Sequence, residues 1–272
     1  MPVRPADLAR RKQAGLPITV LTAWDALSGA LVAEAGADAV LVGDSLAMVV
    51  LGHPTTLPVT LDEMLHHCRA TARGMASACA AGHEPLLICD LPFLSYQCQP
   101  DDAVAAAGRV LKESPAAAVK LEGAEPETLA VIDRLVRSGI PVMGHVGLTP
   151  QSVHRTGYRR QATDAASRER LRTAARALEQ AGCFALVVEH VPAEAATELS
   201  HTLTIPVIGI GAGDSCDGQV RVTADLLGLT GSQPPFSPPL LQGRSLALEA
   251  LRLWLAAQSR PSSTTAPATP HC

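Results

Sequence analysis

Short apolar runs alternate with helical segments along most of this chain of 272 residues. Runs rich in Val, Ile and Leu, such as ITVLT and FALVVE, are separated by stretches with the apolar spacing of amphipathic helices. This repeated order predicts a parallel sheet with crossover helices, and near-continuous apolar runs are typical of strands covered on both faces. The expected strands are 18–22, 38–43, 86–90, 117–122, 141–146, 184–189, 205–210 and 219–224. The expected helices are 26–35, 61–80, 101–113, 126–138, 165–181, 192–201 and 244–257.

The number of these units favours a closed barrel over an open sheet. Eight strand–helix units in roughly 230 residues match the size of a (β/α)8 TIM barrel. An open doubly wound sheet would place a Gly-rich dinucleotide loop after its first strand, and TAWDALSGA is not one. GIGAG at 209–213 follows a strand and is either a tight, close-packed turn or a loop that binds an anion through backbone amides.

We expect residues 1–259 to form this single barrel domain. The tail 260–272 is rich in Pro, Ser and Thr, contains too little apolar material to pack, and is predicted to be disordered. Four prolines in 232–243 predict a loop, which could act as a flap.

Charge and composition narrow the possible partners. The net charge of −4 provides no basic field for nucleic acid or an anionic membrane surface, so neither is expected as a partner. No apolar stretch approaches the ~20 residues that span a bilayer, and the first residues lack a hydrophobic signal region. The seven cysteines include no CxxC pair. Reduced thiols and a cytoplasmic location are therefore expected.

Polar residues recur at one place in this pattern, where an apolar run ends. Asp44, Asp90, Glu122 and Glu189 each close such a run, and His145 lies at an equivalent position. Any one of them alone could be a helix cap or a surface residue. A carboxylate at the end of a buried strand is unfavourable unless it is paired, and α/β barrels carry their chemistry at the carboxyl ends of the strands. Together they predict one shared polar site.

The pattern also predicts the chemistry of that site. Lys120 and Glu122 are two residues apart, so in a strand both face the barrel lumen. Three carboxylates in one place cannot all remain ionised without a cation, and oxygen ligands suit Mg²⁺, whereas zinc would prefer His and Cys. A metal beside a lysine and a histidine is a receptor for a small 2-oxo acid, whose adjacent C–H it acidifies by stabilising an enolate. Glu189, on a distant strand, remains as the proton acceptor.

Six segments resemble the ketopantoate hydroxymethyltransferase family (3-methyl-2-oxobutanoate hydroxymethyltransferases). They occur in a specific order, and the resemblance extends over most of the chain, from Leu21 to about Gly231. The segments are LVGDSLAMVVLGHPTTLPVT (41–60), CDLPFLSY (89–96), VKLEGA (119–124), GHVGLTPQS (144–152), VVEHVP (187–192) and IPVIGIGAGDSCDGQV (205–220).

This resemblance implies a barrel of the phosphoenolpyruvate/pyruvate superfamily type, often assembled as a homodecamer. It implies transfer of a hydroxymethyl group from 5,10-methylenetetrahydrofolate to 3-methyl-2-oxobutanoate through a Mg-stabilised enolate, giving 2-dehydropantoate for pantothenate biosynthesis. The family's Mg²⁺ ligands match Asp44, Asp90 and, usually through water, Glu122. Its substrate contacts match Asp44, Ser45, Asp90, Lys120 and His145, and its proton acceptor matches Glu189.

The chain departs from the family pattern at three places. Trp24-Asp25 replaces the usual Tyr-Asp, HRTGYRRQA occupies 154–162, and Phe236 is followed by Ser-Pro-Pro. All three lie outside the metal and base residues, so they bear on the folate contacts, lid and subunit contacts. Two other functions stay open: another Mg²⁺-dependent 2-oxo-acid lyase or mutase of the same superfamily, and a non-catalytic barrel.

Overall fold

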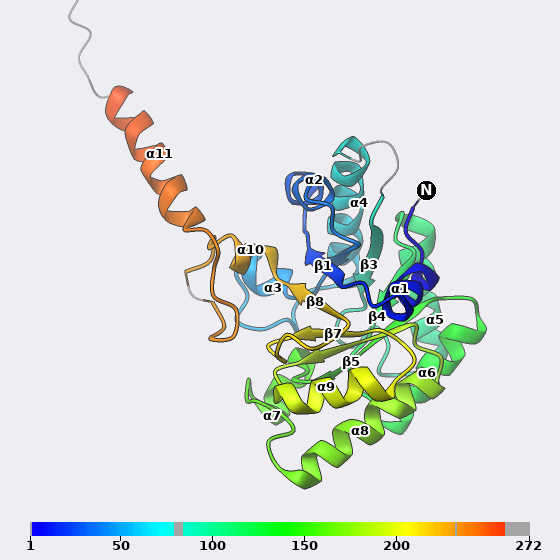
Figure 1. The fold of residues 1–272 in the computed structure, drawn as a ribbon. Coiled ribbons are helices and arrows are strands. Elements are labelled where there is room, and N and C mark those ends of the chain that lie inside the picture. The colour runs from blue at the N-terminus through cyan, green and yellow to red at the C-terminus, as the bar shows by residue number, and fades with distance from the viewer. Residues whose placement is uncertain (1, 79–83, 232, 259–272) are drawn as a thin grey trace, which may run out of the picture.

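The computed structural model describes residues 2–78, 84–231 and 233–258. Eight parallel strands close into a barrel in chain order, each paired with the next and β8 with β1 (Figure 1). The strands are β1 (Ile18–Thr22), β2 (Ala39–Val42), β3 (Leu86–Asp90), β4 (Ala118–Lys120), β5 (Val142–Gly147), β6 (Ala185–Glu189), β7 (Val207–Ile210) and β8 (Gly218–Arg221). The predicted (β/α)8 barrel is confirmed, and the open-sheet alternative is wrong.

The long helices match the expected ones to within a residue or two. They are α2 (Ala26–Glu34), α4 (Leu61–Ala78), α5 (Pro100–Glu113), α6 (Pro126–Arg137), α8 (Ala165–Gln180), α9 (Ala193–Thr202) and α11 (Gly243–Gln258). Five further elements were not expected. They are α1 (Pro5–Gln13), α3 (Leu46–Val49), η1 (Pro150–Ser152), α7 (Val153–Thr156) and α10 (Thr223–Leu226). Helix α1 is mostly polar, and the other four have only three or four residues.

Side-chain alternation along the strands separates the core into two layers. In β3, Leu87 and Cys89 pack outward against the helices, whereas Leu86 and Ile88 fill the barrel interior. Successive side chains of a strand point to opposite faces, so Asp90 follows Leu86 and Ile88 on the inward face. The same rule places polar residues in the last inward layer of β4, β5 and β6.

Helix α1 lies against β1 and β6 and covers the end of the barrel at which the strands begin. Its Leu8 is fully buried with the interior residues. The Lys12 ammonium donates hydrogen bonds to Ser200 O (2.8 Å), Ile205 O (3.0 Å) and Asp217 Oδ2 (2.8 Å). The helix and its lysine therefore tie the amino-terminal segment to the loops before β7 and β8.

Helix α11 departs from the ring of helices and projects away from the barrel (Figure 1). Within the described residues, no helix has the length and apolar character needed to cross a bilayer. The predicted disordered tail, 260–272, lies outside the described residues, and the 1–259 domain boundary stays a prediction.

Candidate functional site

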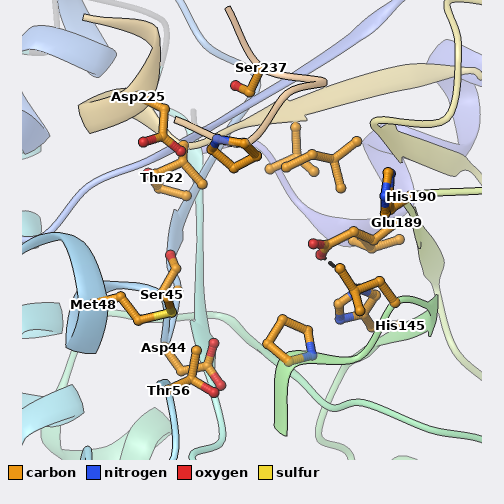
Figure 2. Close-up of a pocket in the computed structure, with 18 of the residues that line it drawn as sticks. Thr22, Asp44, Ser45, Met48, Thr56, His145, Glu189, His190, Asp225 and Ser237 are labelled. Carbon is orange, nitrogen blue, oxygen red and sulfur yellow. Dashed lines mark ion pairs between the residues drawn. The ribbon is translucent and has the colours of Figure 1, made fainter. Parts of the chain in front are cut away.

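A cavity of about 410 Å³ opens at the carboxyl ends of the strands, and Figure 2 shows residues that line it. The seven residues predicted from the sequence all line it, although they come from widely separated parts of the chain. They are Asp44, Ser45, Asp90, Lys120, Glu122, His145 and Glu189. The structure therefore gathers the predicted residues into one pocket, as a barrel requires.

Asp90 and Lys120 are register partners at the ends of β3 and β4. Their side chains form a buried ion pair, with Lys120 Nζ 2.9 Å from Asp90 Oδ1. Burial lowers the pKa of Lys120, but Asp90, Asp44 and Glu122 outweigh it and hold the ammonium protonated. The backbone N–H of Asp44 donates to Asp90 Oδ2 at 3.0 Å, which anchors the turn after β2 to this pair.

Glu122 lies just beyond β4, which ends at Lys120, so the prediction that it is part of the strand is wrong by two residues. The chain nevertheless stays extended, because Leu121 N and Gly123 N donate to carbonyls of β5 at 3.1 and 3.0 Å. Leu121 packs outward, and Glu122 faces the pocket with Lys120. The predicted shared orientation of Lys120 and Glu122 is therefore confirmed.

Gln151 is a buried residue of η1 that the sequence reasoning did not single out. Its side-chain Nε2 donates to Asp44 Oδ2 at 2.8 Å and to Leu91 O at 3.0 Å, and its backbone N donates to Glu122 Oε2 at 2.9 Å. The buried Tyr96 hydroxyl donates to Gln151 Oε1 at 2.8 Å. These contacts hold two acids in place. The sequence signals for Gln151 were its position shortly after a strand and its place in the GHVGLTPQS segment.

His145 lies between two carboxylates from neighbouring strands. Its Nδ1 is 3.4 Å from Glu122 Oε1. Its Nε2 is 3.2 Å from Glu189 Oε2, and Figure 2 shows these two side chains facing each other. Burial and the charge of Lys120 lower the pKa of His145, but Glu122 and Glu189 outweigh them and raise it to about 9. The imidazolium therefore links Glu189 to the Asp44–Asp90–Glu122 group. His145 is inside β5, two residues before its last residue.

The charge of the pocket fits a divalent cation. At the Lys120 end of the pocket, four carboxylates face two cationic groups, Lys120 and the protonated His145, so the carboxylates, if all ionised, would outnumber the cations by two. Burial, and then Asp90 and Glu122, raise the pKa of Asp44 well above its usual value. A bound cation would relieve this repulsion, and an all-oxygen donor set suits Mg²⁺.

In the described part of the chain, no three His, Cys, Asp or Glu side chains are arranged to hold an ion as they stand. Lys120 occupies one oxygen of Asp90, and Gln151 occupies one oxygen each of Asp44 and Glu122. These contacts engage oxygens that a metal would need, so direct contact of a metal with all three acids would require small side-chain shifts or bridging waters.

The GIGAG loop supports the wall of the pocket. Gly211 has a positive φ of 59°, and a Cβ there would lie 2.6 Å from Phe236 of the 232–243 loop. Phe236 also packs on the ring of His190, with centroids 4.6 Å apart. Close packing accounts for this glycine, in agreement with the tight-turn interpretation.

Comparison with known proteins identifies the family of this chain. The family model described as ketopantoate hydroxymethyltransferase matches residues 2–261. The chain belongs to this family. It is 72% identical over 268 residues to a 3-methyl-2-oxobutanoate hydroxymethyltransferase of Parasynechococcus marenigrum (strain WH8102), covering 98% of this chain and 99% of the relative. A second relative with that name, from Synechococcus sp. (strain CC9902), is 69% identical over 272 residues, covering 99% and 100%.

Solved structures of low sequence identity share the fold of this family member. A phosphoenolpyruvate phosphomutase of Streptomyces platensis subsp. rosaceus has a TM-score of 0.64 at 13% identity, covering 98% of this chain and 92% of that chain. A 2,3-dimethylmalate lyase, described as a member of the PEP mutase/isocitrate lyase superfamily, has a TM-score of 0.58 at 15% identity with the same coverage. This likeness shows that the barrel fold is shared.

Proposed function

We propose that this chain transfers a hydroxymethyl group from 5,10-methylenetetrahydrofolate to 3-methyl-2-oxobutanoate, giving 2-dehydropantoate for pantothenate biosynthesis. The observation that carries the proposal is the intact group of Asp44, Asp90, Glu122 and Lys120 beside Glu189 in one pocket. Family membership and the names of its relatives support the choice of substrate.

Magnesium would be held by Asp44 and Asp90, with Glu122 in contact directly or through water. When bound, the ion supplies the Lewis acidity that makes the proton beside the keto group easier to remove. The fit rests on the excess of negative charge and on the raised pKa of Asp44.

Other residues of the pocket bind the 2-oxo acid and transfer its proton. Lys120, buried and protonated, attracts the carboxylate of the 2-oxo acid. Ser45 lies at the same end of the pocket as Asp44 (Figure 2). Glu189 accepts the proton from C3, after which that carbon bonds to the one-carbon unit. The bonds of that unit to the folate nitrogens break, water supplies the hydroxyl group, and tetrahydrofolate leaves. His145 contacts Glu189 and keeps its carboxylate oriented during the proton transfer.

The alternative, a Mg²⁺-dependent lyase or mutase, has less support. The solved mutase and lyase structures are 13–15% identical to this chain and share the fold alone. Relatives at 65–72% identity instead carry the hydroxymethyltransferase name.

A cytoplasmic homo-oligomer, a decamer by resemblance to the family, completes the proposal. Helix α11 supports self-association because it exposes large apolar side chains away from the barrel, and a second copy of this chain is the occupant we expect there. The exposed side chains include Leu246, Leu251, Leu253 and Trp254.

The decisive assay combines purified protein, Mg²⁺, 3-methyl-2-oxobutanoate and 5,10-methylenetetrahydrofolate, and follows 2-dehydropantoate by mass spectrometry. Exchange of the C3 proton with D2O, followed by NMR without folate, reports the first half of the reaction. Product formation supports the transfer, and exchange without product would favour the lyase or mutase. Absence of both would reject the proposal, and lack of Mg²⁺ or 2-oxo-acid binding by calorimetry would favour a non-catalytic barrel.

A further inference from the structure

The pocket has a second polar end, which the chemistry described so far does not use. Figure 2 shows Asp44 and Ser45 at one end and Thr22, Asp225 and Ser237 at the other. All five residues line the same cavity. The inference drawn from this second end rests on the proposed transfer and concerns its second substrate.

Asp225, on α10, provides a buried carboxylate at this end. It is 4% exposed, and among the described residues only Thr230 Oγ1 donates to it, reaching Oδ1 at 3.1 Å. Burial raises the pKa of Asp225, and Thr230 and Arg221 offset this only in part. A buried carboxylate with an unused oxygen is unfavourable unless a ligand supplies donors.

Ser237 provides an independent observation at the same end. It is 2% exposed, and its Oγ has no hydrogen-bond partner among the described residues, although it lines the cavity. The surrounding loop is held in place: Ser237 N donates to Pro234 O at 2.8 Å, and Arg221 Nη2 donates to Pro238 O at 3.1 Å. The Ser237 hydroxyl is therefore held in a fixed position from which it can form a hydrogen bond with a ligand.

The ligand that fits must present adjacent hydrogen-bond donors to the carboxylate. A 2-oxo acid does not fit, because its own carboxylate would face that of Asp225, whereas Lys120 attracts it to the opposite end. The pteridine ring of a folate carries a 2-amino group next to N3–H, two donors spaced to pair with one carboxylate, and a neighbouring carbonyl oxygen.

We propose that Asp225 and Ser237 bind the pteridine ring of the folate co-substrate. Asp225 accepts from the 2-amino group and N3–H, and the Ser237 hydroxyl donates to the adjacent ring carbonyl. Phe236, next to Ser237, contributes an apolar wall. The two substrates are then sorted by charge: the anionic 2-oxo acid lies at the Lys120 end and the donor edge of the pteridine at the Asp225 end.

The test compares Asp225→Asn with wild type. The amide would place an N–H₂ donor against the donors of the ring. Since a hydrogen bond to a charged group contributes 1.5–3 kcal/mol, the KM for 5,10-methylenetetrahydrofolate should rise about 10- to 100-fold. The KM for the 2-oxo acid should stay within about twofold, so the ratio of transfer to C3 proton exchange falls at low folate. Ser237→Ala should raise the folate KM less, and Asp225→Glu should restore part of the loss.

Asp214→Asn, which removes an exposed carboxylate, serves as the matched control and should leave both KM values unchanged. An unchanged folate KM in Asp225→Asn, or equal rises in both KM values, would overturn the assignment. If circular dichroism shows that Asp225→Asn does not fold, the affinity of Ser237→Ala for tetrahydrofolate is measured by calorimetry instead. An affinity equal to that of wild type would reject the assignment. Failure of wild type to form product would instead count against the proposed function itself.

Discussion

Gln151 and Asp44 lie 107 positions apart, yet a buried hydrogen bond of 2.8 Å joins Gln151 Nε2 to Asp44 Oδ2. The backbone N–H of the same glutamine holds Glu122 Oε2. One residue therefore positions two of the three acids proposed to hold Mg²⁺. Tyr96 fixes the direction of the amide, because its hydroxyl donates to Gln151 Oε1.

We expect Gln151→Leu to weaken Mg²⁺ binding about 10- to 100-fold, the usual effect of losing a residue that orients metal ligands. Titration calorimetry with Mg²⁺ alone measures this without turnover. Gln97→Leu is the matched control, because Gln97 donates to the same Oε1 but makes no hydrogen bond to a carboxylate among the described residues. Equal loss of affinity in both variants would show that the effect is structural.

Glu189→Gln should lower the rate of C3 proton exchange by about 10²- to 10⁴-fold, because the amide cannot accept the proton. Its Mg²⁺ affinity should remain nearly that of wild type, since Glu189 contacts His145 rather than the acids. NMR in D2O measures the exchange, and Glu194→Gln, on the exposed face of α9, is the control. Loss of Mg²⁺ binding in Glu189→Gln would contradict its assigned role.

Lys12→Met should destabilise the barrel by about 3 kcal/mol, because Asp217 would keep a largely buried charge without its partner. Urea denaturation measures this change. Lys112→Met, at an exposed position of α5, should change the stability by less than about 0.5 kcal/mol. Similar small effects in both variants would mean that α1 contributes little to the closure of the barrel.

Cys183 is expected to make stability fall at alkaline pH. Burial raises its pKa from 9.0 to about 12, so between these values the folded state keeps a proton that the unfolded state releases. The contribution of the protonated Cys183 thiol to the free energy of unfolding is fully present below pH 9. It is lost as the pH rises above 9, by about 1 kcal/mol per pH unit. Cys183→Ala cannot titrate there, so the stability difference between the two proteins should narrow from pH 9 to 11. A constant difference would contradict the prediction.

Trp254→Glu should shift the protein to smaller species in sedimentation velocity, because it places a charge in the apolar face that α11 exposes. Arg252→Glu, which changes an exposed charge on the same helix, should leave the assembly size unchanged. Identical sedimentation of wild type and Trp254→Glu would count against this helix as the subunit contact.

Most of the barrel could be predicted because its signal is local. Apolar runs and their helical spacers are set by side-chain periodicity within short segments, and the seven long helices and the eight strands of the described residues were expected. Glu122 was expected inside a strand, but β4 ends at Lys120. Helix α1 was missed because it is mostly polar, and it is held by the tertiary contacts of Leu8 and Lys12.

The sequence by itself determined the layer of polar residues, because a period of two places Asp90, Lys120 and Glu189 on the inward face at the ends of their strands. Only the tertiary structure decided which partners each would meet. Gln151 reaches Asp44, His145 lies between two carboxylates, and Asp225 and Ser237 share the far end of the pocket. These contacts join segments that no local spacing relates, because they depend on how the barrel closes and where its loops fold over the mouth.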